Sequence, residues 1–307
     1  MSTATAQGPT ARRAMRGKRL GGAVNTLPLV APSVVLLLVF SLVPLAATLY
    51  FSVIRYNLLN PMLHGFAGWA NYRYLLQDPA LYQSLFISVA LVGEVLILTV
   101  GFGAILASLF EAKFPGRAIA RVLVISPFFV MPTVSALVWK NLLMNPVNGL
   151  IAYITRSLGF RAIDFFATLP LTSIVVIVAW QWLPFAFLIL LTALQSLDEE
   201  TREAAHLDGA GPIRTFLHIE LPHMGRAISV VILMETIFLL GIFAEIYVTT
   251  AGGPGTQTTN LTFLIYERAL LAFNVGSASA AGVIAIILAN ILAIFLVRAI
   301  GKRLDET

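Results

Sequence analysis

Residues 170–195 read PLTSIVVIVAWQWLPFAFLILLTALQ and include no charged side chain. A helix rises about 1.5 Å per residue, so this stretch is long enough to cross the roughly 30 Å hydrocarbon core of a bilayer. The whole chain is 58% hydrophobic and 11% charged, whereas soluble domains are about 25% charged. A soluble fold of this composition would lack the polar residues needed to cover its surface. The stretch therefore predicts an integral membrane protein.

Five further apolar segments of similar length bring the number of predicted membrane helices to six. The six cover residues 27–54, 82–110, 118–142, 170–195, 226–250 and 277–300. Prolines in or beside them predict kinks, whose freed backbone groups must be satisfied by neighbouring helices. These prolines are Pro32, Pro44, Pro127, Pro132 and Pro184. We expect an all-α integral membrane fold: a mobile cytoplasmic tail, residues 1–20, and one six-helix transmembrane domain, residues 21–307.

The basic residues predict how these segments are oriented. Five of them precede stretch 27–54, which exceeds the roughly 7–15 apolar residues of a signal peptide and is expected to remain as the first span. With the N-terminus inside, fourteen Lys and Arg fall in cytoplasmic segments and six in outer loops. Both termini and the loop 198–222 are therefore expected in the cytoplasm. The net charge of +5 is interpreted as this topological signal and not as a nucleic-acid surface.

The most charged stretch of the chain lies between two strongly apolar segments and reads DEETREAAHLDGAGPIRTFLHIELP, residues 198–222. Asp198 can cap a helix whose first turn holds two glutamates, which suit the positive end of the helix dipole. That helix should end at Asp208-Gly209, because glycine permits a left-handed turn. Pro212 suits the first turn of a second helix, and Pro222 marks its end. The loop predicts a compact knob of two short helices joined by a glycine elbow.

This loop resembles the coupling motif of the permease subunits of bacterial ATP-binding cassette (ABC) importers. That motif reads Glu-Ala-Ala, three residues, Gly, nine residues and Ile-x-Leu-Pro, and this chain meets every fixed position. The matching residues, with the aspartate that commonly precedes the glycine, are Glu203, Ala204, Ala205, Asp208, Gly209, Ile219, Leu221 and Pro222. The resemblance implies a type I ABC importer permease. In that family the knob docks on a separate ATPase and transmits a rigid-body motion to the membrane helices.

The same resemblance implies the partners. They are a second homologous permease subunit, two copies of a cytoplasmic ABC ATPase, a periplasmic or lipid-anchored solute-binding protein, and the lipid of the bacterial inner membrane; nucleic acid is not among them. Neither Gly17-Lys18 nor Gly301-Lys302 lies in a phosphate-binding loop. We therefore expect this chain to be a transport subunit and not an enzyme, with no cofactor or metal of its own. ATP and Mg²⁺ would be bound by the ATPase subunits.

Other stretches resemble the carbohydrate-importing branch of that family. Asn71-Tyr72 with Asp78-Pro79, and TAGGP at 250–254, resemble the larger membrane subunit of the maltose transporter. ISPFFVMPT at 125–133 and AWQWLP at 179–184 resemble sorbitol and mannitol permeases. The resemblance implies import of a sugar or sugar alcohol by alternating access. The alternative cargo is a glycosyl-glycerol or a sulfonated sugar glycoside such as sulfoquinovosyl glycerol.

The register of the maltose subunit also implies a substrate path. The positions that match its sugar contacts are Val178, Gln181, Trp182, Phe185, Glu235, Phe238, Leu239 and Ile242. Gln181 and Glu235 would hydrogen-bond hydroxyl groups, while Trp182 and Phe238 would stack on the C–H face of a sugar. Each aromatic could instead pack in the core, and Glu235 could instead join two helices. Several polar positions of the maltose site are apolar here, so the pattern of contacts must differ.

Three further residues are weaker candidates. Glu94 and Glu245 are carboxylates within predicted spans, where a charged group is energetically costly and is usually kept for a function. Alternatively, Glu94 could make a structural contact between helices, and Glu245 could lie near the outer interface, where its cost is small. Lys140 would suit an anionic cargo or could be a snorkelling interfacial lysine.

Two other classes of protein compete with the importer. An ion-coupled secondary transporter could use Glu94 or Glu235 as its ion site, but such folds usually show paired halves, and the coupling motif would be unexplained. A membrane-embedded enzyme or insertion factor would need a catalytic constellation in the helices. All four histidines fall in predicted loops, and no metal-ligand spacing is present.

Overall fold

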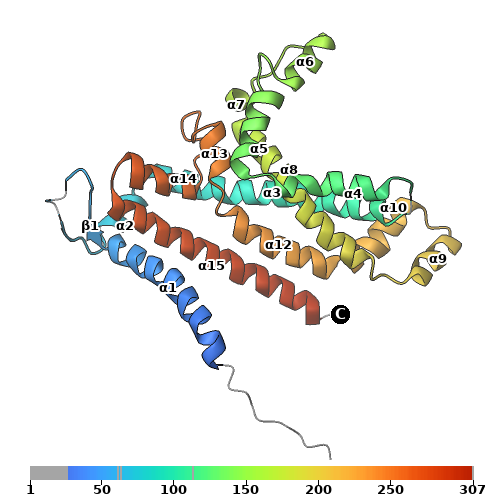
Figure 1. Cartoon of the computed structure of the whole chain (residues 1–307), viewed down its shortest axis with the longest axis horizontal. Coiled ribbons are helices and arrows are strands. Elements are labelled where there is room, and N and C mark those ends of the chain that lie inside the picture. The colour runs from blue at the N-terminus through green and yellow to red at the C-terminus, as the bar shows by residue number, and fades with distance from the viewer. Residues whose placement is uncertain (1–26, 61, 63, 113, 306–307) are drawn as a thin grey trace, which may run out of the picture. The chain divides into compact units, whose positions relative to one another are not determined.

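The structure, a computed structural model, describes residues 27–60, 62, 64–112 and 114–305. These residues are mostly helical (Figure 1). The α-helices are α1 (Leu27–Ser52), α2 (Ala70–Leu76), α3 (Pro79–Glu111), α4 (Arg117–Ile125), α5 (Pro132–Val138), α6 (Leu150–Ser157), α7 (Phe165–Thr168), α8 (Pro170–Leu194), α9 (Glu199–Leu207), α10 (Pro212–Thr215), α11 (Leu221–His223), α12 (Gly225–Leu239), α13 (Ala244–Thr249), α14 (Leu261–Tyr266) and α15 (Val275–Asp305). The predicted tail, residues 1–20, lies outside the described residues.

Short irregular elements join these helices. A 3₁₀ turn, η1 (Ser126–Phe129), follows α4, and three π-helical turns are η2 (Trp139–Leu143), η3 (Phe216–Glu220) and η4 (Glu267–Leu271). Two strands, β1 (Ile54–Arg55) and β2 (Gly65–Phe66), pair antiparallel. The chain divides into two compact units, residues 1–45 and 46–307. In the first, the described side chains from Val30 to Leu45 are exposed and apolar apart from two serines, as suits a helix surrounded by lipid or by a partner.

Within the described residues, four helices are long and apolar enough to cross a membrane, and two bent pairs raise the number to six if each pair is one span. The four are Val30–Ser52, Pro79–Glu111, Pro170–Leu194 and Val275–Arg298. The bent pairs join Arg117–Phe129 to Pro132–Leu143 at 106° and Pro212–His223 to Gly225–Leu239 at 65°. The sequence therefore located all six apolar segments and predicted kinks at Pro127 and Pro132 in segment 118–142, but it predicted no break in segment 226–250.

The break in segment 118–142 follows from its two prolines. Pro127 lies at the start of the 3₁₀ turn η1, directly after Ser126, and its carbonyl accepts a hydrogen bond from the Val130 amide at 3.1 Å. Met131 precedes Pro132 and is extended (φ −61°, ψ 137°), as steric conflict with a following proline ring requires. The carbonyl of Val130 then accepts a hydrogen bond from Nε2 of Gln181 on α8 at 2.6 Å. A neighbouring helix thus satisfies the group freed by the break.

Segment 226–250 breaks between Leu239 and Ala244. The free carbonyl of Leu240 accepts a hydrogen bond from Oγ1 of Thr262 at 3.0 Å. The carbonyl of Ile242 accepts one from Nδ2 of Asn260 at 2.6 Å. Oδ1 of Asn260 also accepts from the Phe263 amide at 2.8 Å, which caps the start of α14. The first turn of α14 therefore holds α12 and α13 apart as two separate helices.

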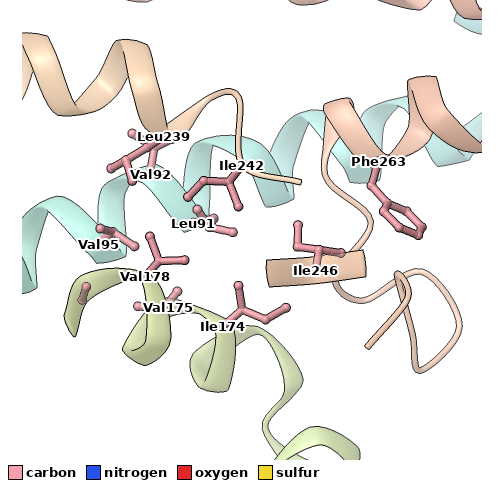
Figure 2. Close-up of a cluster of buried hydrophobic side chains, with 11 residues drawn as sticks. Leu91, Val92, Val95, Ile174, Val175, Val178, Leu239, Ile242, Ile246 and Phe263 are labelled. Carbon is pink, nitrogen blue, oxygen red and sulfur yellow. The ribbon is translucent and has the colours of Figure 1, made fainter. Parts of the chain in front are cut away.

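The buried core is built around α3 and α8. One cluster joins these two helices to the residues around the second break (Figure 2). Its labelled members are Leu91, Val92, Val95, Ile174, Val175, Val178, Leu239, Ile242, Ile246 and Phe263. A second cluster lies further along both helices, where Ala104 and Ala107 of α3 meet Ala186 and Phe187 of α8. Small residues there let two helix backbones approach closely, as is common in membranes.

Gly103 lies at a close approach of α3 to α8. A Cβ atom built on it would lie 3.0 Å from Cβ of Ala186 and 3.3 Å from the Phe187 amide nitrogen. We expect Gly103→Leu to force the helices apart and to cost about 1–3 kcal/mol of stability. Gly101→Leu is the matched control, because nothing lies within 4 Å of a Cβ atom there. Thermal unfolding of both variants in nanodiscs, followed by tryptophan fluorescence, measures the difference; equal midpoints would contradict the prediction.

Candidate functional site

The loop 198–222 folds into the predicted knob. Helix α9 ends at Leu207, Gly209 takes the left-handed conformation (φ +77°), and α10 begins at Pro212. Two hydrogen bonds close the end of α9: the Asp208 amide donates to the Ala204 carbonyl and the Ala210 amide to the Ala205 carbonyl, both at 2.9 Å. The second helical stretch continues through η3 and α11, so Pro222 lies inside α11 and not at its end. In Figure 1 the knob lies at the end of α3 that is opposite to α2.

The knob presents both its motif and two apolar side chains at its surface. Glu203, Ala204, Asp208, Gly209 and Pro222 of the motif are exposed, Ile219 and Leu221 are half-buried, and Ala205 is buried. Leu207 is 88% exposed and Ile213 is 75% exposed. Exposed leucine and isoleucine on a charged loop mark a surface suited to contact with another protein. Neither residue stood out in the sequence, although Leu207 directly precedes Asp208 of the motif.

A cluster of charges fixes the inner side of the knob. Nη1 of Arg202 on α9 lies 3.1 Å from Oε1 of Glu111, the last residue of α3, and its Nε lies 3.4 Å from Oε1 of Glu220 in η3. Oγ of Ser108 on α3 donates to Oε2 of Glu220 at 2.5 Å. We call these four residues the ionic clamp. Sequence reasoning missed it, because the three charges are far apart in the chain and only their positions at helix ends hinted at a shared location.

The residues of the predicted substrate path separate into two groups. Five are buried in the described chain: Val178, Gln181, Glu235, Leu239 and Ile242. Three of these five, the aliphatic ones, belong to the packed cluster of Figure 2. The aromatic residues Trp182, Phe185 and Phe238 are at least partly exposed. Only the aromatic members of the predicted path therefore reach a surface in this conformation.

These aromatic side chains form a continuous patch with one residue that was not among the predicted contacts. The ring of Trp182 lies 5.4 Å from that of Phe238 and 5.9 Å from that of Phe185. Phe128 of η1 lies 5.9 Å from Trp182 and stacks on Phe185 at 6.2 Å. Phe238 is 55% exposed and Phe128 is 41% exposed. We call these four residues the aromatic patch; it joins α8, α12 and the first break.

The two polar side chains of the predicted path are both used to hold helices. Gln181 donates to the Val130 carbonyl at the first break. Oε2 of Glu235 accepts a hydrogen bond from Oγ1 of Thr99 on α3 at 2.6 Å, in an environment where Glu235 is fully buried. Their contact with a solute stays a prediction.

The weaker candidates occupy three different settings. Nζ of Lys140 donates to the carbonyl of Val248 at 2.9 Å, near the C-terminus of α13, where a cation also suits the helix dipole. Glu245 is buried in the first turn of α13. Glu94 is exposed near the middle of α3. A carboxylate at that depth is costly against lipid, by about 2.5–3.5 kcal/mol on translocon-insertion scales, so this face of α3 is suited to a polar neighbour.

Comparison with known proteins identifies relatives across most of the chain. Residues 99–306 match the family described as "Binding-protein-dependent transport system inner membrane component". A probable ABC transporter permease protein, y4oQ, of Sinorhizobium fredii is 31% identical over 91% of this chain and 90% of its own. The sn-glycerol-3-phosphate transport system permease protein UgpA of Rhizobium meliloti is 31% identical over 90% of this chain and 94% of its own. The trehalose/maltose transport system permease protein MalF of Thermococcus litoralis is 31% identical over 81% of this chain and 85% of its own.

A solved structure has the same fold. It is a bacterial ABC transporter involved in the import of the acidic polysaccharide alginate, with a TM-score of 0.75 and 19% identity, covering 90% of this chain and 94% of that chain. The predicted all-α type I permease architecture is thereby confirmed.

Asn260 offers a test of how the second helix break is held. Asn260→Ala would leave the Ile242 carbonyl without its donor and α14 without its cap, which we expect to cost about 2–4 kcal/mol in total. Asn290→Ala is the control, because the exposed Asn290 amide bonds only to Ile286 of its own helix among the described contacts. Denaturation midpoints in nanodiscs measure the effect. A midpoint for Asn260→Ala equal to that of the control would contradict the account of the break.

Proposed function

This chain belongs to the family of binding-protein-dependent transport system inner membrane components, and we propose that it is one of two permease subunits of an ATP-driven importer for a sugar or sugar alcohol. The observation that carries the proposal is the knob, which exposes five of its eight motif residues together with Leu207 and Ile213 at one end of α3. A knob of this kind has no evident use in a carrier that needs no partner.

The knob is the proposed contact with a cytoplasmic ATPase. The exposed first turn of α9 carries Glu199 and Glu200, and Glu203 follows one turn later. This acidic face would suit a basic rim around an apolar recess in the partner, with the exposed leucine and isoleucine in the recess. ATP and Mg²⁺ would be bound by two such ATPase subunits, so the energy for transport reaches this chain only through the knob.

The aromatic patch is the proposed solute surface of this subunit. Flat aromatic rings pack well on the C–H faces of sugars, and a partly exposed patch beside a helix break is accessible to a solute when the helices move. Relatives are named for sn-glycerol-3-phosphate and for trehalose and maltose, which are all polyhydroxylated. A polyol such as sorbitol or mannitol, or a monosaccharide, is our first choice.

The setting of Lys140 favours a neutral cargo. Its ammonium group is engaged with the Val248 carbonyl, so binding an anion there would require this contact to be replaced. A sulfonated glycoside such as sulfoquinovosyl glycerol is therefore the second choice, and an uncharged glycosyl-glycerol remains compatible with the aromatic patch.

The remaining partners follow from surfaces that this chain leaves open. We propose that the Glu94 face of α3 lies against the second permease or the water-filled path, because lipid would disfavour an exposed carboxylate there. A solute-binding protein would deliver the cargo from the outer side of the bacterial inner membrane. Both termini would lie in the cytoplasm, in agreement with the count of basic residues.

The elbow of the knob offers a test of coupling. Gly209 has φ +77°, whereas Gly211 has φ −74°, and a Cβ atom would meet nothing within 4 Å at either position. Gly209→Val should therefore be strained by backbone conformation alone, by about 1–2 kcal/mol or more, and Gly211→Val should not. We expect Gly209→Val to lower ATP-driven uptake severalfold in proteoliposomes that contain the complete complex, with Gly211→Val close to wild type.

The same proteoliposomes test the energy source. The wild-type complex should show solute-stimulated ATP hydrolysis. Uptake by this chain alone that ignores ATP and is abolished by a proton ionophore would instead establish an ion-coupled carrier, with buried Glu235 as the natural ion site.

The aromatic patch predicts a change in apparent affinity. Trp182→Ala and Phe128→Ala each remove an aromatic ring whose stacking would contribute about 0.5–1.5 kcal/mol to the binding free energy of the solute. The KM for uptake should therefore rise about two- to tenfold. Trp69→Ala, at an exposed indole before α2, is the control. A panel of polyols, monosaccharides and glycosyl-glycerols, first ranked by their affinity for the cognate binding protein, supplies the solutes. An unchanged KM in both patch variants would place the solute surface elsewhere.

A further inference from the structure

Helix α9 is attached to the rest of the chain by very few side chains. Of its described side chains, Ala205 is buried and Arg202 is largely buried, with 18% of its side chain exposed; the other described ones are exposed. The helix also lacks a long apolar stripe that could pack against the spans. Among its described side chains, those that fasten α9 to the rest of the chain are therefore the buried Ala205 and the charged Arg202.

The ionic clamp joins three separate parts of the chain. Arg202 supplies the cation from α9, Glu111 a carboxylate from the end of α3, and Glu220 a carboxylate from η3. Ser108 ties Glu220 to α3 a second time through its hydroxyl. Both helical stretches of the knob are thus connected to one span, α3, by polar contacts that are mostly shielded from water.

An arginine that lies between two carboxylates can restrain both their distance and their orientation. The guanidinium group can hold two acceptors at fixed angles, which a lysine ammonium cannot do as well. Nε of Arg202 has no hydrogen-bond partner among the described atoms, so its contact with Glu220 is an ion pair, whereas Nη1 donates a hydrogen bond to Glu111. Nη2 of Arg202 and Oε2 of Glu111 are both buried without a hydrogen-bond partner among the described atoms. They belong to the same pair, so this contact can tighten into a two-bonded fork under a small displacement without losing its first bond.

We propose that Arg202 is a positioning residue that locks the knob to α3, so that displacement of α9 by a partner moves α3 instead of deforming the loop. The inference rests on the proposed function, because it assumes that a partner displaces the knob. The proposal predicts that loss of the ionic clamp uncouples ATP hydrolysis from transport, so that less solute is transported for each ATP hydrolysed. A contact that served folding alone would change the amount of complex but not this ratio.

The first measurement is transport per ATP hydrolysed by the complete complex in proteoliposomes. Arg202→Ala should lower this ratio at least about fivefold, the lower end of usual coupling between sites, while hydrolysis continues. Arg202→Lys should recover part of the loss, because the charge remains. The triple variant Glu111→Gln, Arg202→Met, Glu220→Gln leaves no unpaired charge to disturb folding, and it should assemble but stay uncoupled. Arg298→Met, at an exposed arginine on α15, is the control.

The second measurement does not depend on transport. The chain contains no cysteine, so Glu200→Cys on α9 and Ala112→Cys beside α3 place two spin labels at exposed positions. The distance distribution between them should be narrow in the wild type and clearly broader with Arg202→Ala.

The outcomes separate the two proposals. A wild-type complex without ATP-driven uptake would refute the proposed function, whatever the spin labels show. A working wild-type complex whose triple variant keeps the normal ratio, or an Arg202→Ala chain with an unchanged distance distribution, would overturn the role of Arg202.

Discussion

Backbone carbonyls freed at two helix breaks must find hydrogen-bond donors inside the protein, because the core of a bilayer offers none. Gln181 serves the break before Pro132, and Asn260 with Thr262 serves the break after Leu239. Without these donors neither break would be tolerated at membrane depth. Much of the arrangement around α8, α12 and α14 follows from this constraint, since each donor fixes one helix against another.

That constraint also shapes the surface available to a solute. Of the polar side chains which could meet sugar hydroxyls, Gln181 uses its amide nitrogen on a backbone carbonyl and Glu235 uses one carboxylate oxygen on Thr99. The other oxygen of each is buried without a hydrogen-bond partner among the described atoms. What this subunit presents is aromatic: Trp182 and Phe238, with Phe128 beside them. Stacking on aromatic side chains favours the binding of a sugar-like solute over that of water, but it discriminates poorly among different sugars. Selectivity for one cargo must then depend on the partner subunit, on a solute-binding protein, or on rearrangement of these helices during transport.

The sequence was informative wherever the physics is local. Apolar length located the six segments, and the glycine and proline of the loop predicted the elbow at Gly209 and the start of α10 at Pro212. It failed where groups distant in the chain meet. Nothing near Asn260 indicates that it serves the carbonyl of Ile242, so the break in segment 226–250 was missed. The ionic clamp escaped for the same reason. Register by resemblance placed Leu239 and Ile242 in a solute path, and this stays a prediction; in the present conformation both lie in the apolar cluster.

Close packing gives the proposed coupling a physical route. The clamp connects the knob to the end of α3, and α3 meets α8 so tightly at Gly103 that a single methyl group would crowd Ala186. Two helices in such contact can slide or turn together but cannot compress, because packed interiors transmit strain. Helix α8 carries Trp182, so any displacement of α3 that preserves this packing must also move the aromatic patch. Force applied at the knob would therefore reach the proposed solute surface through two contacts, one ionic and one steric, and neither requires the loop itself to be stiff.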